Sequence, residues 1–186
     1  AERTSEGWIS IRDGVETGPL LGGCLETICW HVKGSSAWVD PQNAILFFET
    51  SEEAPSPATV DAYLTDLDQL GVFDAAAGLV FGRPYGYTDE DTRLLWDVLA
   101  APTAAAGLPV LANVEIGHAD PMVTLPLGVR AELDAGRDVR PVIVVTADLE
   151  IVVEEVGDAL AAEPRGLEPA ALPRQHAAVV GRRGAG

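Results

Sequence analysis

Two residues that could do acid–base chemistry each follow a short apolar run. Glu49 ends the run 44–49 (AILFFE), and His118 comes shortly after the run 109–114 (PVLANV). If both runs are strands of one parallel sheet, their carboxyl ends meet at the edge where α/β proteins bind ligands. A histidine can then act as a general base near neutral pH while the carboxylate fixes its tautomer. The pair predicts one half of a nucleophile–histidine–acid hydrolase.

Other interpretations of the same residues stay open at this point. Glu49 could be a strand-end carboxylate that accepts backbone hydrogen bonds, and His118 could be a structural, capping residue of its GHADP turn. The grouping of His118 with Glu115 and Asp120 could also bind a metal, although one histidine near two acids is common by chance. We predict neither a metal nor a cofactor.

The sequence lacks an obvious nucleophile. It contains no G-x-S-x-G elbow. Ser35 and Ser36 lie in a KGSSAW turn with no predicted strand before it and no helix after it. Neither Cys24 nor Cys29 stands at a strand-to-helix elbow. The residues therefore indicate an acid and a base without the third member of a triad.

Four further side chains are candidates for binding a substrate. Arg83 and Tyr85 follow the apolar run 78–82 and so should reach the same sheet edge. Glu115 lies close to His118, and Trp38 flanks the glycine-rich segment 18–23, with core packing as its alternative. We expect these four residues to contact the substrate.

The periodicity of apolar residues predicts the elements that position these groups. Helices should begin near Leu25, after Ser56 and after Thr88, and the glycine-rich segment 18–23 should form turns. We predict strands over 8–12, 44–49, 78–82, 109–114, 122–125, 128–133, 141–146 and 149–155. Strands that alternate with amphipathic helices form parallel sheets with right-handed crossovers. The fold class is therefore α/β, with a parallel β-α-β-α-β core followed by a run of mainly antiparallel strands, 134–137 forming a hairpin-like turn.

Composition and length limit the partners, the location and the domain organisation that the sequence allows. The 186 residues carry 12 Lys and Arg against 29 Asp and Glu, a net charge of −17. This balance argues against nucleic acid and anionic membranes as partners. No apolar run of 18 residues predicts a membrane span, and the absence of a recognisable signal peptide makes a cytoplasmic location the default. We predict one folded domain over residues 1–157 and a mostly disordered Ala/Gly/Pro/Arg-rich tail over 158–186.

Longer stretches resemble the C-terminal domain of the LD-carboxypeptidase superfamily of serine peptidases. The similar segments are GPLLGGCLETICWHVKGSSAW (18–38), AILFFETSE (44–52), QLGVFDAAAGLVFGRPYG (69–86) and PVLANVEIGHADPMVTLPLGVRAELD (109–134). The GH…TLPLG pattern is the most specific, and the resemblance covers roughly residues 8–155. The motifs GGCLET, NVEIGH and GRP look more like the branch with microcin C self-immunity peptidases than like murein tetrapeptide carboxypeptidases.

The resemblance implies roles that the residues alone left open. It makes Glu49 the triad acid and His118 the triad base, in a domain called a swivelling β/β/α fold. It also implies an N-terminal domain that carries the serine and the oxyanion hole, and homodimers. Cys24, Ser35 and Glu115 stand where relatives commonly have Asn, Thr and Asp. Because the serine-bearing domain is not in this sequence, which begins at Ala1, we expect about half of an enzyme plus a tail.

Three functions follow as hypotheses. The first is the Glu/His half of a serine carboxypeptidase or amidase, inactive alone, whose serine comes from a domain in cis or trans. Its substrates would be L,D-peptides of the murein type or microcin-like peptidyl nucleotides. The second is a non-catalytic binding or scaffold module of the same fold. The third is a metal-dependent hydrolase that uses His118 and Asp120.

Overall fold

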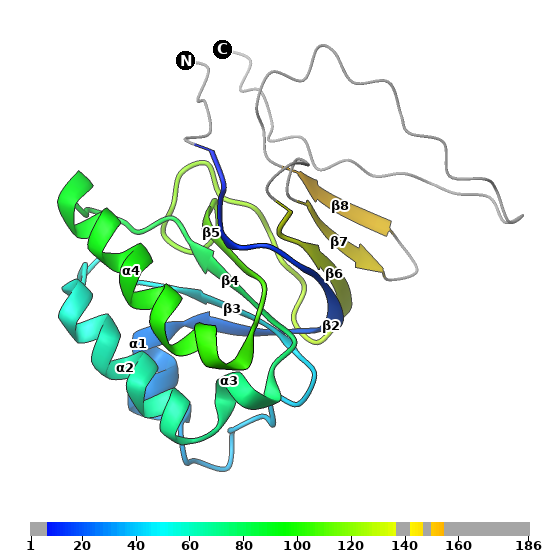
Figure 1. Ribbon diagram of the computed structural model, residues 1–186, viewed down its shortest axis with the longest axis horizontal. Helices are drawn as coiled ribbons and strands as arrows, with labels where there is room; N and C mark the ends of the chain where they lie inside the picture. The colour runs from blue at the N-terminus through cyan, green and yellow to red at the C-terminus, as the bar shows by residue number, and fades with distance from the viewer. Residues whose placement is uncertain (1–6, 137–141, 147–149, 155–186) are drawn as a thin grey trace, which may run out of the picture.

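The computed structural model describes residues 7–136, 142–146 and 150–154 (Figure 1). These residues form an eight-stranded sheet in the order β1-β5-β4-β3-β2-β6-β7-β8. The strands are β1 (Ile9–Arg12), β2 (Val15–Cys24), β3 (Ile45–Glu49), β4 (Gly78–Gly82), β5 (Val110–Val114), β6 (Arg130–Asp134), β7 (Val142–Thr146) and β8 (Glu150–Glu154). The helices are α1 (Leu25–Thr27), the π-helix η1 (Ile28–Val32), α2 (Pro57–Gln69), α3 (Val72–Ala75) and α4 (Asp89–Ala106).

The centre of the sheet is parallel, as the sequence predicts. Strands β2, β3, β4 and β5 run in one direction, while β1 pairs antiparallel with β5 at the edge. Capping residues start the two crossover helices. The Ser56 hydroxyl accepts a hydrogen bond from Thr59 N–H (3.2 Å) at α2, and the Thr88 hydroxyl accepts one from Asp91 N–H (3.1 Å) at α4. The predicted strand–helix–strand–helix–strand order is confirmed.

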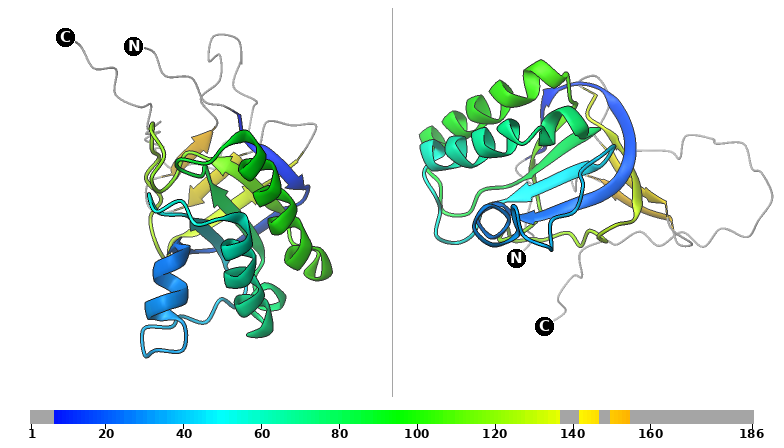
Figure 2. Two further views of the ribbon diagram at one scale, coloured as in Figure 1. Left: turned by 90° about the vertical axis from the view of Figure 1, so that its left-hand side faces the viewer. Right: turned by 90° about the horizontal axis from the view of Figure 1, so that it is seen from below.

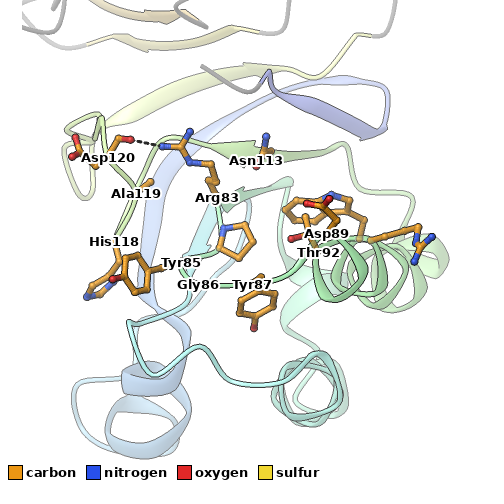
Figure 3. Close-up of a pocket in the computed structure, with 13 residues that line it drawn as sticks. Arg83, Tyr85, Gly86, Tyr87, Asp89, Thr92, Asn113, His118, Ala119 and Asp120 are labelled. Carbon is orange, nitrogen blue, oxygen red and sulfur yellow. Dashed lines mark hydrogen bonds between the residues drawn. The ribbon is translucent and has the colours of Figure 1, made fainter. Parts of the chain in front are cut away.

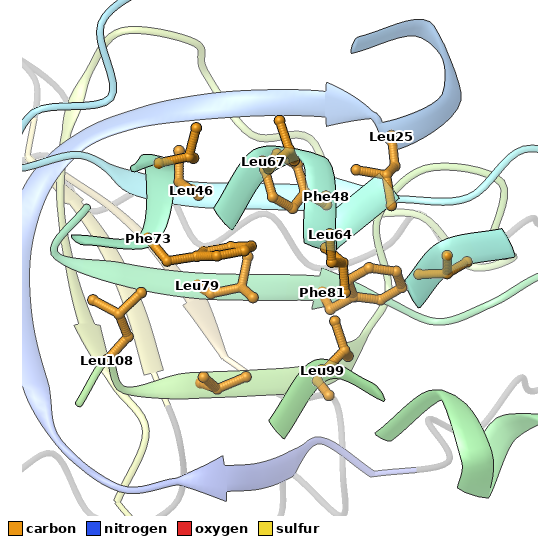
Figure 4. Close-up of a cluster of buried hydrophobic side chains, with 14 of the residues drawn as sticks. Leu25, Leu46, Phe48, Leu64, Leu67, Phe73, Leu79, Phe81, Leu99 and Leu108 are labelled. Carbon is orange, nitrogen blue, oxygen red and sulfur yellow. The ribbon is translucent and has the colours of Figure 1, made fainter. Parts of the chain in front are cut away.

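Helices α2 and α4 cover one face of these strands (Figure 2). Leu46 and Phe48 of β3 point into the resulting core, where they meet Leu64 of α2 and Leu99 of α4 (Figure 4). All four side chains are buried, and their removal from water is the main force that holds the helices on the sheet. This packing fixes the strand ends that carry the candidate site.

The opposite face of the sheet has a second core because the sheet curls (Figure 2). Leu20, Ile45 and Val80 there pack with Leu133 of β6 and Ile143 of β7. Burial on both faces explains why the central strands are continuous apolar runs rather than alternating ones.

The segment 18–23 forms part of a strand, so the prediction of turns there was wrong. The first half of β2 pairs antiparallel with β6 and its second half pairs parallel with β3. Gly22 allows this close approach, because a Cβ there would lie 1.7 Å from the carbonyl oxygen of Phe47. Glycine in this segment marks tight strand packing rather than a turn.

The predicted helix at Leu25 and one predicted strand also differ from the structure, and some other predictions fall on residues that the structure does not describe. The helix predicted from Leu25 is a three-residue α1 followed by η1, and residues 115–129 contain no helix or strand, so 122–125 is not a strand. The strands predicted over 128–133, 141–146 and 149–155 correspond to β6, β7 and β8, which pair antiparallel. The tail 158–186 and part of the 134–137 turn lie outside the described residues, and the domain boundary at 157 stays a prediction. None of the described helices is long and apolar enough to cross a lipid bilayer.

Candidate active site

Glu49, the last residue of β3, lies in a space that two glycines leave open. Its side chain is 9% exposed. A Cβ on Gly82, at the end of β4, would lie 2.8 Å from the Cβ of Glu49. A Cβ on Gly117, whose φ is +77°, would lie 2.3 Å from Glu49 Oε2. Backbone therefore encloses the Glu49 side chain on two sides, Gly82 at its Cβ and Gly117 at its carboxylate, and no larger residue fits at either glycine without a shift.

His118 meets this carboxylate directly. Its Nδ1 lies 2.8 Å from Glu49 Oε2, although 69 residues separate the two in sequence. The contact exists because β3, β4 and β5 are adjacent and parallel, so that their carboxyl ends share one edge. A histidine that donates from Nδ1 to a buried carboxylate has Nε2 as its basic nitrogen.

Nε2 of His118 faces a second carboxylate, that of Glu52. The distance from Nε2 to Glu52 Oε2 is 2.8 Å, and the Glu52 side chain is 65% exposed. The hydrogen bond that His118 donates to Glu49 raises the pKa of His118 most. Burial of the ring opposes that effect, and the charges of Glu49, Glu52 and Glu26 add to it. With an acceptor at each nitrogen, the imidazolium form is favoured, since only that form can donate from both.

Glu26 also belongs to this region, although no sequence pattern had pointed to it. It is 3% exposed, and its Oε1 accepts hydrogen bonds from the N–H of Ser51 (3.0 Å) and from the Ser51 hydroxyl (2.7 Å). It therefore ties α1 to the turn that follows Glu49. The signal available in the sequence was an acid placed directly after the Gly-Gly-Cys-Leu stretch.

A pocket of about 770 Å³ opens beside His118 (Figure 3). It is lined by Arg83, Pro84, Tyr85, Gly86, Tyr87, Asp89, Thr92, Arg93, Trp96, Asn113, His118, Ala119 and Asp120. Arg83 donates a hydrogen bond from Nη2 to the carbonyl oxygen of Asp120 (2.8 Å), so it also supports the loop that carries His118. The structure thus brings Arg83 and Tyr85 together with the candidate base.

The structure does not bring Glu115 or Trp38 to this pocket. Glu115 is 4% exposed, and its Oε2 accepts a hydrogen bond from the indole N–H of Trp8 (2.6 Å). Trp38 is half-buried and packs against the core beneath the helices, which was the alternative for this residue. The hydrogen bond with Trp8 accounts for where the Glu115 side chain lies, and packing against the core accounts for Trp38.

The predicted grouping of acids around His118 also differs from the structure. The ring nitrogens of His118 face Glu49 and Glu52 rather than Glu115 or Asp120. In the part of the chain that the structure describes, no group of three or more His, Cys, Asp or Glu side chains could hold a metal ion. Cys24, which ends β2, and Cys29, in η1, are both free thiols.

Comparison with known proteins connects this geometry to one family. Residues 17–133 match the model of the LD-carboxypeptidase C-terminal domain. A putative carboxypeptidase of Synechocystis is 31% identical over 140 residues, which are 72% of this chain and 44% of that protein. The microcin C7 self-immunity protein MccF of Escherichia coli is 31% identical over 123 residues, which are 65% of this chain and 35% of that protein.

A solved structure shows the same fold. The crystal structure of an MccF-like protein from Bacillus anthracis aligns with a TM-score of 0.66 and 29% identity over 77% of this chain and 44% of the other. This similarity confirms the mixed α/β fold class. The chain spans less than half the length of these relatives.

Proposed function

Because this chain belongs to the LD-carboxypeptidase C-terminal domain family, we propose that it supplies the base and the orienting acid of a serine amide hydrolase. The family expected from the sequence is confirmed, whereas the catalytic role is our proposal. One observation carries it: Nδ1 of His118 lies 2.8 Å from the buried carboxylate of Glu49. The serine comes from another domain or another chain.

The alternatives for these two residues explain the geometry less well. A capping histidine would bind main-chain groups, but the partners of His118 within the described residues are carboxylates. A strand-end carboxylate that only accepts backbone hydrogen bonds would not need the space that Gly82 and Gly117 leave around Glu49. A buried acid on Nδ1, and an Nε2 whose partner Glu52 is an exposed side chain that can move away, match the requirements of a general base.

In the proposed reaction, the serine hydroxyl gives its proton to Nε2 of His118 while its oxygen attacks the substrate carbonyl carbon. Glu49 holds the ring and stabilises the imidazolium that forms. His118 then gives the proton to the departing amine as the carbon–nitrogen bond breaks. A water molecule, deprotonated by the same nitrogen, hydrolyses the acyl-enzyme and restores the serine.

The proposed substrates are L,D-peptides or peptidyl nucleotides. The family name and the carboxypeptidase relative support a peptide. An MccF-like protein from Streptococcus pneumoniae, which aligns with a TM-score of 0.63 and 28% identity over 78% of this chain and 46% of the other, was solved in complex with AMP, which supports a nucleotide. Arg83 and Tyr85 contact the substrate in this proposal, because they line the pocket beside His118. A homodimer and a cytoplasmic location remain predictions from the sequence.

A chimera tests this function. The matching segment of the Synechocystis relative is replaced by residues 7–136 of this chain, and amide hydrolysis is measured on a peptide with an L,D-linkage and on an aminoacyl sulfamoyl nucleoside. We expect turnover that His118→Ala lowers by at least about a thousandfold. The matched control is His31→Ala, an exposed histidine of η1 that is outside the site.

Two outcomes would contradict the proposal. Turnover that survives His118→Ala unchanged would remove the role of this residue. A folded chimera that binds either compound but hydrolyses neither would favour the non-catalytic module of the same fold.

A further inference from the structure

The turn after Glu49 sets the access to the basic nitrogen of His118. Glu52 Oε2 lies 2.8 Å from Nε2, the nitrogen that must receive the serine proton in the proposed function, on which this inference rests. An exposed side chain such as Glu52 loses rotamer freedom when it forms an ion pair, and the ion pair itself contributes little free energy. The contact therefore depends on an ordered backbone beneath it.

The backbone beneath Glu52 is a tight turn closed by Ser51. The N–H of Ala54 donates to the carbonyl oxygen of Ser51 (3.1 Å), and the N–H of Glu53 donates to the Ser51 hydroxyl (3.3 Å). Glu52 is thus the second residue of a four-residue turn, 51–54, with Ser51 as its anchor.

Ser51 is itself anchored by Glu26. Both the N–H and the hydroxyl of Ser51 donate to the same oxygen of this buried carboxylate, at 3.0 and 2.7 Å. Hydrogen bonds to an ionised acceptor are stronger than neutral ones, and a buried carboxylate without them would be costly. The other oxygen, Oε2, accepts from the thiol of Cys24 at 3.6 Å, so strand β2 also holds the group in place.

We propose that Glu26 is a positioning residue of the active site: by binding Ser51 it fixes the turn 51–54, and this turn sets Glu52 against Nε2 of His118. While Glu52 is there, a serine hydroxyl cannot reach Nε2, so Glu52 has to swing away before the base can act. Glu26 makes no hydrogen bond to His118 within the described residues, and it acts through Ser51 and Glu52.

Electrostatics offers a second route from Glu26 to His118 that has to be separated from this one. The carboxylates that act on the ring are Glu49 from β3, Glu52 from the turn and Glu26 from α1. Glu26→Gln changes the charge and the anchor together. Ser51→Ala removes one of the two anchoring hydrogen bonds, together with the acceptor for Glu53 N–H within the same turn, and leaves every charge in place, so it reports the mechanical link separately from the charge.

The test is a pH titration of the His118 ring nitrogens by ¹⁵N NMR on the whole chain, assigned with His118→Ala. We expect Glu52→Gln to lower the pKa of His118, because the negative charge beside Nε2 is lost. Ser51→Ala should lower it by a smaller amount. In the Glu52→Gln background, Ser51→Ala should have no further effect. Glu53→Gln, with the same charge change in the same turn, should differ from the wild type less than Glu52→Gln does.

The positioning role is overturned if Ser51→Ala leaves the His118 pKa at its wild-type value, or lowers it equally with and without Glu52. This titration needs no catalysis, so its outcome is independent of the chimera assay. In an active chimera, Ser51→Ala should also move the acid limb of the pH profile of kcat/KM to lower pH, because His118 would lose its proton at lower pH.

Discussion

Two carboxylates lie 2.8 Å from the ring of His118, in regions of opposite character. Glu49 ends a central strand, is 9% exposed and is enclosed by Gly82 and Gly117. Glu52 lies in a turn and is 65% exposed. Water screens the contact of the exposed Glu52 and can compete for its carboxylate, whereas Glu49 is buried, so its contact with His118 is screened less and its side chain has less room to move. Equal distances therefore have different consequences: Glu49 orients the ring, and Glu52 can be displaced.

The largest predicted difference between the two acids is in catalysis. In the chimera, Glu49→Gln should lower kcat/KM by about a thousandfold to ten-thousandfold, because the amide no longer stabilises the imidazolium and can favour the wrong tautomer. Glu52→Gln should change kcat/KM by less than about fivefold, as expected for an exposed ion pair. Equal losses in the two variants would show that burial does not distinguish their roles.

The enclosure of Glu49 can be broken through Gly117. Gly117→Ala places a methyl group 2.3 Å from Glu49 Oε2 at a φ of +77°. Gly128→Ala is the matched control, since its φ is +74° and nothing lies within 4 Å of the new Cβ. In urea unfolding, the control should lose about 1–2 kcal/mol from backbone strain alone. Gly117→Ala should lose about 3–5 kcal/mol, because the clash adds to that strain. Similar losses would mean that the backbone does not enclose the carboxylate.

Glu49 and Glu52 should also differ in how strongly each raises the pKa of His118, although this difference is smaller than the one in catalysis. The hydrogen bond that the ring donates to Glu49 is the largest cause of its increase, and the charge of Glu52 contributes less. Glu49→Gln should therefore lower the His118 pKa more than Glu52→Gln does in the same NMR titration. The reverse order would make the exposed acid the stronger partner.

The smallest effect is expected in the pH dependence of stability. The pKa of His118 is raised above its ordinary value of 6.5, so the folded state binds its proton more tightly than the unfolded state. The resulting stabilisation is present below pH 6.5 and is lost as the pH rises through the folded-state pKa. His118→Gln should therefore cost more unfolding free energy at pH 5.5 than at pH 9. An equal cost at both values would contradict the assigned ion pairs.

Much of the fold and the main pair of the site could be predicted from local patterns. Apolar runs with amphipathic helices between them indicated β3, β4 and β5, and for that reason Glu49 and His118 were predicted to lie at the same edge of the sheet. The strand β2 was missed, because the glycines that usually mark turns here allow its backbone to lie against β3. Glu115 was expected to contact the substrate, which would place its side chain at the pocket. In the structure its carboxylate instead accepts a hydrogen bond from the indole N–H of Trp8.

Sequence alone determined which elements form and which strand ends carry an acid and a base, because apolar periodicity, caps and strand-ending residues act over a few positions. Only the tertiary structure decided which carboxylate meets which nitrogen of His118. That choice depends on Glu26 reaching Ser51 across 25 residues and on two glycines that lie far from Glu49 in the chain. Such contacts follow from how the sheet curls and where its loops meet, and no local pattern of residues records that arrangement.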